Sequence, residues 1–164
     1  MRLIRSTAWC LRFIKKSRKR PTPTDELLPE ELEKAEHLWI KTVQQQYFQE
    51  EIQCLKMKKE IPKLSKLNPL TPVLDDNGIL RVMSRIQRAE LEINVKMPII
   101  LETQRSLTRL LILWHHKRID HHGQELLVNE LRQKYYIYNL RAAVKRSWSE
   151  CQYCKNYRAK PHPP

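Results

Sequence analysis

The chain has 164 residues, and its 31 Lys or Arg against 18 Asp or Glu give a formal net charge of +13. This length suits one modest domain or two small ones, and no apolar run approaches the roughly 20 residues that cross a bilayer, which excludes a helical membrane protein. Two glycines and ten prolines, among many Glu, Lys, Leu and Gln, favour helix over sheet. We therefore expect a mainly α fold with a small antiparallel β element.

The positive charge is concentrated at the two ends of the chain. Residues 1–20 and residues 105–164 each carry a net charge of +8, whereas residues 21–104 carry a net charge of −3. Two basic regions around a near-neutral middle predict a polyanionic partner, most simply nucleic acid. The alternative is a lysine-rich surface that contacts only water.

The first 28 residues are expected to form a basic tail. Residues 1–20 contain eight Lys or Arg and no acid, which is typical of a mitochondrial presequence. The run Lys15–Arg20 is typical of a nuclear-import or nucleic-acid-contacting segment, and a disordered basic tail is the third interpretation. We favour the last two together, and a nuclear location, without excluding the presequence.

Residues 29–60 are predicted to form one long amphipathic helix. Pro29 suits the first helical position, and Glu30 and Glu31 suit the positive end of the helix dipole. Near-helical spacing predicts one inward face, made of Leu32, Ala35, Trp39, Val43 and Tyr47. The isolated His37 and His162 are interpreted as ordinary surface residues.

Residues 61–104 are predicted to hold a linker and a small β region. Prolines 62, 69 and 72 favour an extended linker. Residues 73–82 predict a hairpin, since Asn77-Gly78 can take the positive φ values of a tight turn. Residues 98–101 are an apolar strand candidate, so we expect a small antiparallel sheet.

Residues 105–160 are predicted to form three short helices. The first ends at the histidines, the second follows Gly123, and the third ends at Cys151, with Tyr135–Ile137 as an interruption before it. The expected inward residues are Leu107, Leu110, Leu111 and Trp114 on the first helix, Leu127, Val128 and Leu131 on the second, and Leu140, Val144 and Trp148 on the third. Three helices of this length bury too little apolar surface to be safely stable alone.

A histidine cluster and a cysteine pair predict one structural zinc ion. The cluster contains His115, His116, His121 and His122, and the pair is Cys151-x-x-Cys154. Imidazole nitrogen and thiolate sulfur suit Zn²⁺, and two of each close a tetrahedron that has no open position for catalysis. The remaining cysteines, Cys10 and Cys54, are isolated, and no secretory signal is present, so a reducing intracellular compartment with zinc rather than disulfides is expected. Spacing alone leaves open which histidine of each adjacent pair is the ligand.

Several ordered motifs resemble a known family. His116-x4-His121-x-Gly123, Leu131-Arg132-x-x-Tyr135-Tyr136-Ile137, Arg141-x-x-Val144, Cys151-x-x-Cys154 and Arg158–Pro161 resemble the integrase zinc-binding domain of LTR retrotransposon polyproteins. Upstream, Arg5–Ile14, Leu32–Ile40, Leu74–Val82 and Pro98–Leu101 resemble the segment that precedes the integrase in Pao/BEL-type elements. The resemblance thus covers nearly the whole chain.

The resemblance implies His116, His121, Cys151 and Cys154 as the zinc ligands, with His115 and His122 as bystanders or hydrogen-bond donors. It also implies a three-helix unit that helps integrase to multimerise and to engage element DNA ends. The basic residues of this C-terminal segment are the predicted DNA contacts, without sequence preference: Lys117, Arg118, Arg132, Lys134, Arg141, Lys145, Arg146, Lys155, Arg158 and Lys160.

The sequence departs from the family pattern at three places. Met83-Ser84-Arg85 stands where Gly-Gly-Arg is usual, which puts a positive-φ geometry in doubt there, and Tyr136 stands where a Trp is usual. The chain ends ten residues after Cys154, so the catalytic core with its Asp/Asp/Glu triad is expected to be absent, and Asp75, Asp76 and Glu150 do not match that triad. We therefore expect no enzymatic activity from this chain itself.

Four functions are compatible with these patterns. The first is a zinc-stabilised module that binds nucleic acid and associates with itself, with no membrane and no small-molecule substrate. The second is a protein–protein interaction module, the third is a fragment of a longer polyprotein whose core is the enzyme, and the fourth is a non-functional retroelement remnant.

Overall fold

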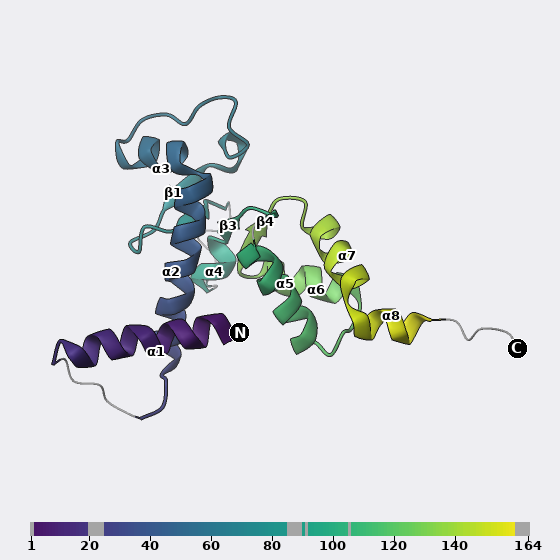
Figure 1. The fold of residues 1–164 in the computed structure, drawn as a ribbon. Helices are drawn as coiled ribbons and strands as arrows, with labels where there is room; N and C mark the ends of the chain where they lie inside the picture. Colours follow the sequence, from purple (N-terminus) through teal and green to yellow (C-terminus); the bar gives the residue numbers. More distant parts are fainter. Residues whose placement is uncertain (1, 20–24, 85–89, 91, 105, 160–164) are drawn as a thin grey trace, which may run out of the picture.

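The fold is that of a computed structural model, which describes residues 2–19, 25–84, 90, 92–104 and 106–159. Within these residues, helices surround a small four-stranded sheet (Figure 1). The α-helices are α1 (Arg2–Ser17), α2 (Pro29–Tyr47), α3 (Gln49–Lys56), α4 (Ile93–Lys96), α5 (Ser106–Arg118), α6 (Gln124–Arg132), α7 (Leu140–Glu150) and α8 (Gln152–Arg158), with one 3-10 helix, η1 (Asn68–Leu70). The strands are β1 (Pro72–Leu74), β2 (Leu80–Val82), β3 (Ile99–Leu101) and β4 (Tyr135–Ile137). A mainly α fold with a small β element is confirmed.

The N-terminal basic segment is a helix, so the prediction of a disordered tail is wrong for residues 2–17. Helix α1 crosses the lower end of α2 (Figure 1) and buries Arg12, whose Nη2 lies 2.5 Å from Glu31 Oε2 on α2. The same guanidinium donates to the carbonyl oxygens of Asp25 and Glu26. A buried charge needs such partners, and periodicity in a basic segment does not reveal them. Arg20, the last residue of the predicted import run, lies outside the described residues.

The predicted helix over residues 29–60 is two helices. Helix α2 ends at Tyr47, Phe48 leaves the helical region with φ −114° and ψ 37°, and α3 ends at Lys56. Phe48 is itself buried in a second small core beneath α3, which accounts for the bend. Pro29 occupies the first turn as predicted, and the Glu31 carboxylate accepts a hydrogen bond from the Leu28 N–H at 3.1 Å.

The buried stripe of α2 differs from the predicted one because it includes polar side chains. Glu31, Ala35, Ile40 and Gln44 are buried, whereas Leu32, Trp39 and Val43 are half-buried and Tyr47 is exposed. His37 is also mostly buried rather than on the surface, since its side chain is 14% exposed. A pattern of apolar residues alone cannot anticipate a polar side chain whose partners lie elsewhere in the chain.

The hairpin and the strand at residues 99–101 are confirmed, and the sheet is mixed rather than antiparallel. Strands β1, β2 and β3 pair antiparallel, and β4 then pairs in parallel with β3. Within the hairpin, Gly78 has a φ of 71° and its N–H donates to the Asp75 carbonyl at 2.7 Å. The segment predicted as an interruption, Tyr135–Ile137, is therefore the fourth strand of the sheet.

A side chain of α2 completes the hydrogen bonding between β2 and β3. The two strands share one paired position, Arg81 with Ile99. Beside it, the Gln44 amide donates to the carbonyl oxygens of Leu80 and Ile100 at 2.9 and 2.8 Å and accepts from the Leu80 N–H at 2.8 Å. Gln44 thus fixes α2 against the centre of the sheet.

One hydrophobic core joins α2, the sheet and the C-terminal helices. It contains Ile40, Ile79, Ile99 and Leu101 together with buried residues of α5, α6 and α7. Of the predicted inward residues on α5, Leu107 and Leu111 are buried, while Leu110 and Trp114 are exposed. The predicted α6 face is buried in full. No helix in the described part of the chain is long and apolar enough to span a membrane.

The departure at Met83 and Ser84 leaves the local backbone ordinary. Among the described residues, the positive-φ positions do not include Met83 or Ser84. Both residues therefore follow the hairpin without left-handed backbone, and the expected conflict with a Gly-Gly geometry does not arise. Arg85 lies outside the described residues.

Candidate metal centre

The two histidines of the centre come from the end of α5. His116 lies in the last turn of the helix and is completely buried. The chain then reverses through Asp120 and His121, whose φ values are 49° and 60°, and the His121 N–H donates to the His116 carbonyl at 3.0 Å. Left-handed backbone at two successive residues other than glycine is uncommon and costs free energy. It turns the His121 ring back toward the ring of His116.

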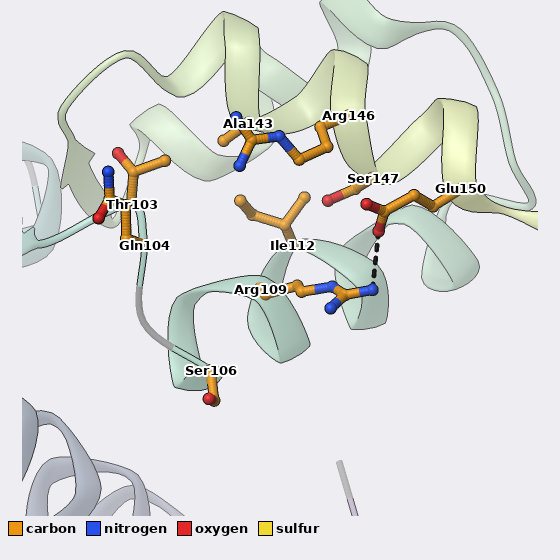
Figure 2. A pocket seen from close by; sticks show the side chains of 9 residues that line it. All are labelled: Thr103, Gln104, Ser106, Arg109, Ile112, Ala143, Arg146, Ser147 and Glu150. Carbon is orange, nitrogen blue, oxygen red and sulfur yellow. Dashed lines mark hydrogen bonds and ion pairs between the residues drawn. The ribbon is translucent and has the colours of Figure 1, made fainter.

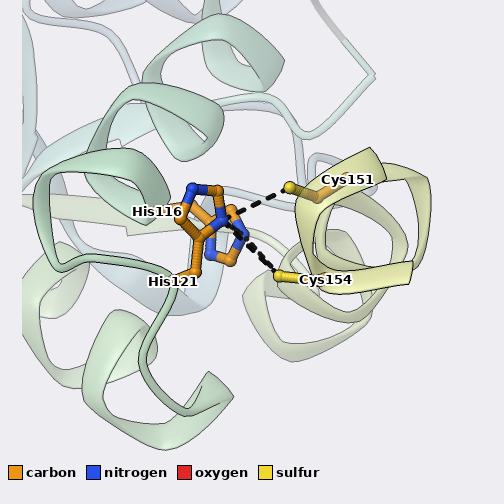
Figure 3. A group of neighbouring side chains, drawn as sticks. All are labelled: His116, His121, Cys151 and Cys154. Atoms are coloured by element: carbon orange, nitrogen blue, oxygen red, sulfur yellow. Dashed lines mark hydrogen bonds between the residues drawn. The ribbon is translucent and has the colours of Figure 1, made fainter. Parts of the chain in front are cut away.

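The two cysteines flank the start of α8. Cys151 is the residue between α7 and α8, and Cys154 is the buried side chain in the described part of α8. In Figure 3 both sulfurs point from the α7–α8 turn toward the histidine rings. The metal ligands therefore join the end of α5 to the end of α7, as the sequence predicts.

The four potential ligand atoms lie within 4.8 Å of one another. His116 Nε2 is 2.9 Å from His121 Nδ1 and 3.2 Å from Cys154 Sγ, and Cys151 Sγ is 3.3 Å from His121 Nδ1. Zn–N and Zn–S bonds of ordinary length in a tetrahedron separate the ligand atoms by about 3.3–3.8 Å. The residues fit a single zinc ion, since two imidazole nitrogens and two sulfurs converge with nearly these spacings.

The structure selects one histidine from each adjacent pair. The ring of His115 points to the other side of α5, where it packs edge-on against Trp114 at a centroid distance of 4.7 Å. His122 is exposed, and its Nδ1 contacts the Asp120 carbonyl at 3.1 Å. Within this cluster, His116 and His121 are the two that reach the cysteines.

Burial favours zinc coordination at His116 and opposes it at Cys154, where the thiolate is needed. It lowers the pKa of His116, which is lowered further by the neighbouring His121 and Lys117, so the ring is neutral and its nitrogen can coordinate. Burial and contact with Cys151 raise the pKa of the Cys154 thiol. Bound zinc supplies the positive charge that stabilises both thiolates.

Comparison with known protein families identifies the C-terminal part of the chain. Residues 103–160 match the family model of the integrase zinc binding domain. This region contains all four ligands of the centre, so an integrase-type zinc-binding region begins just after β3. The search of the curated proteins and the search of the solved structures found no match.

Most of the predicted nucleic-acid contacts lie on the surface of the integrase-type region. Lys134 is held by Glu36 of α2, at 2.8 Å between Nζ and Oε2, and Arg141 forms an exposed ion pair with Glu125 at 2.8 Å. Arg158 stacks over the ring of Trp148 at 4.0 Å. The exposed residues are Lys117, Arg118, Arg132, Arg141, Lys145, Arg146, Lys155 and Arg158, while Lys160 lies outside the described residues.

A pocket of about 260 Å³ lies between α5 and α7 (Figure 2). Arg146 lines it, as do Ser147 and the exposed ion pair between Arg109 Nη2 and Glu150 Oε2 at 2.8 Å. Glu150, one of the acids that do not match the catalytic triad of the family, is therefore paired with an arginine. Asp75 is likewise paired, with Arg81 at 2.6 Å.

Two contacts of the integrase-type region were not predicted, one at the metal centre and one outside it. The ring of Tyr153 packs on the His121 ring at a centroid distance of 4.4 Å, tilted by 32°. Glu36 of α2 binds Lys134 and the hydroxyl of Tyr135, which anchors β4 close to the end of α5. No local pattern links Tyr153 to His121, or Glu36 to residues about a hundred positions away.

Proposed function

We propose that this chain is an integrase-type, zinc-stabilised module that binds DNA and associates with itself, without catalytic activity of its own. The observation that carries the proposal is a cluster of four potential zinc ligands, two buried and two half-buried, in a region whose described Lys and Arg side chains are exposed apart from Lys134. The zinc ion holds α5, α7 and α8 together, and the exposed cations then neutralise phosphates of the DNA backbone. Such contacts give affinity without base recognition.

The origin that fits this module best is the polyprotein of a Pao/BEL-type LTR retrotransposon. Its support is the order of sequence motifs from Arg5 to Pro161, together with the family match over residues 103–160. An intracellular, nuclear location accords with reduced cysteines, a basic N-terminal helix and a DNA partner. The ion pairs made by Asp75 and Glu150 favour structural roles for these acids over catalytic ones.

A protein–protein interaction module is the second candidate. The exposed residues Leu110 and Trp114 lie four positions apart on α5 and present an apolar strip. Such a strip suits self-association or a partner helix. Light scattering of the full chain with zinc present tests it, since a stable monomer at all concentrations would remove self-association.

A salt titration tests the DNA-binding proposal. Fluorescence polarisation of a labelled duplex should give a logarithmic slope of affinity against salt of roughly −0.9 for each phosphate contacted. Lys155→Gln should make that slope shallower by roughly 0.9, the value for one phosphate contact. Lys59→Gln, an exposed lysine outside the integrase-type region, is the control and should leave the slope unchanged. A slope near zero in the wild-type chain would reject DNA binding.

A further inference from the structure

Helix α8 exposes two aromatic rings that the zinc centre does not need. Tyr153 and Tyr157 lie four positions apart, so both project from the same side of the helix, and their exposed fractions are 61% and 86%. Cys154 is the buried side chain of this helix. Tyr153 is partly accounted for by its contact with His121. Among the described residues, the Tyr157 side chain makes no hydrogen bond and no aromatic contact, so its ring is open to solvent.

The surroundings of the two tyrosines are basic. Helix α8 carries Lys155 and Arg158 and no acidic residue. Because Tyr153 packs on His121, the aromatic side of α8 adjoins the turn after α5. Helix α8 lies at the far end of the integrase-type region from α1 and α2 (Figure 1). The two tyrosine rings are therefore exposed on a helix that has basic residues and no acidic one, with Lys155 projecting from the opposite side of the helix.

We propose that Tyr153 and Tyr157 form a stacking platform for the bases of single-stranded nucleic acid, such as an unpaired DNA end. Flat aromatic side chains beside positive charge bind single strands without sequence preference, since every base has a face to stack and every linkage has a phosphate. In a duplex the bases already stack on one another, so the platform distinguishes unpaired from paired DNA. A second copy of this chain is a poorer occupant because two faces of like charge repel each other.

The proposal rests on the proposed DNA-binding function, and one set of variants separates the two. The full-length, zinc-loaded chain is titrated with labelled oligothymidylate of about 20 nucleotides and with a duplex of the same length. This length is chosen because a single-strand-binding domain with stacking aromatic residues covers fewer nucleotides than about 20. Tyr157→Leu keeps the apolar bulk and removes the aromatic face, whereas Tyr157→Phe keeps the aromatic face. Tyr138→Leu, at an exposed tyrosine outside α8, is the control for surface changes.

The expected result is a loss of about tenfold in affinity for oligothymidylate with Tyr157→Leu, the size of one base–aromatic stack. Duplex affinity should be unchanged, and Tyr157→Phe and Tyr138→Leu should behave as the wild type. Equal affinity of Tyr157→Leu and wild type for oligothymidylate overturns the platform, as does an equal loss for the duplex. So does a change of oligomeric state in Tyr157→Leu, which would make this face a protein interface. If the wild type binds neither probe, the DNA-binding function itself fails.

Discussion

Two neighbouring histidines on α5 project in different directions from the helix. Consecutive helical residues are rotated by about 100°, so only one of the pair can reach the cysteines of the α7–α8 turn. His116 does so from a completely buried position, and His115 packs against Trp114 and Tyr135. The metal centre therefore depends on which side of α5 faces α8.

Alanine at these two positions should separate zinc binding from packing. His116→Ala is expected to lose the zinc ion, because three ligands remain in a site built for four. His115→Ala is expected to keep about one zinc per chain and to lose only a little stability. Metal analysis of both purified variants, with far-UV circular dichroism, measures the difference. Equal zinc content in the two variants would contradict the assignment of His116.

The buried ion pair between Arg12 and Glu31 makes the N-terminal helix sensitive to acid. Hydrogen bonding to Arg12 lowers the pKa of Glu31 below its ordinary value of 4.5, against the opposing effect of burial. A carboxylate with a lowered folded-state pKa stabilises the fold above its unfolded-state pKa, and this contribution is lost as pH falls through the folded-state value. Acid should therefore release α1 from α2.

Glu31→Gln should make this pH dependence measurable. At neutral pH the variant leaves Arg12 buried with a weaker partner, and breaking a buried pair costs about 3–5 kcal/mol. As pH falls below 4.5, the ordinary pKa of this carboxyl group, the wild type progressively loses the same interaction, and the difference between the two proteins should shrink toward the lowered folded-state pKa. Urea unfolding at several pH values tests this, with Glu30→Gln, at an exposed neighbour, as the control. The role of the ion pair would be contradicted if the difference in unfolding free energy between wild type and Glu31→Gln stayed constant down to about pH 3, roughly a unit and a half below the ordinary pKa of the carboxyl group.

At the level of single elements, α2 is tied to the sheet by one amide. Gln44 satisfies three backbone groups of β2 and β3 in a buried position. An unpaired buried polar group costs about 1–3 kcal/mol. This side chain therefore replaces hydrogen bonds that the two strands do not make to each other.

Gln44→Leu should destabilise the chain by about 2–4 kcal/mol, because the apolar side chain leaves buried carbonyl groups without donors. Gln45→Leu, at the exposed next residue of α2, should change the unfolding free energy by less than about 0.5 kcal/mol. Chemical denaturation of the two variants checks the contrast. Similar values for both would mean that Gln44 is not needed to join α2 to the sheet.

Local sequence patterns predicted the elements that depend on local chemistry. Pro29 at the start of α2, Gly78 in the hairpin and the apolar run of β3 each carry their own signature, and all three are found. The apolar residues of α1 also recur at helical spacing, so its helical state was visible in the sequence although it was not predicted. The ion pair of α1 with Glu31 and the pairing of Tyr135–Ile137 with β3 join segments that share no local pattern.

At the level of the whole molecule, the integrase-type region shares its core with the rest of the chain. Ile40 of α2 and Ile99 of β3 pack in the same cluster as Leu111, Leu131 and Val144. Glu36 of α2 holds Lys134 and Tyr135 at the start of β4. The four zinc ligands were predictable from residue type and spacing, but this shared packing was not, because it joins segments without a common motif.

A fragment of residues 105–164 should therefore be less stable than the full chain even with zinc bound. It lacks β3, the partner strand of β4, and the fully buried Ile40, Ile79 and Ile99. Each such side chain contributes about 1.5–3 kcal/mol, so a difference of several kcal/mol in unfolding free energy is expected. Thermal unfolding of both proteins in excess zinc measures it. Matching transitions would show that the region folds on its own.

The parallel pairing of β3 with β4 also has a consequence during synthesis on the ribosome. The first three strands emerge before residues 135–137 leave the exit tunnel, because β4 follows β3 by more than thirty positions. In that interval the nascent sheet has an open, wholly apolar edge at Ile99–Leu101, the kind of edge that pairs with neighbouring chains. A nascent chain that halts after β3 has emerged and before β4 has emerged is expected to pair with neighbouring chains at this edge.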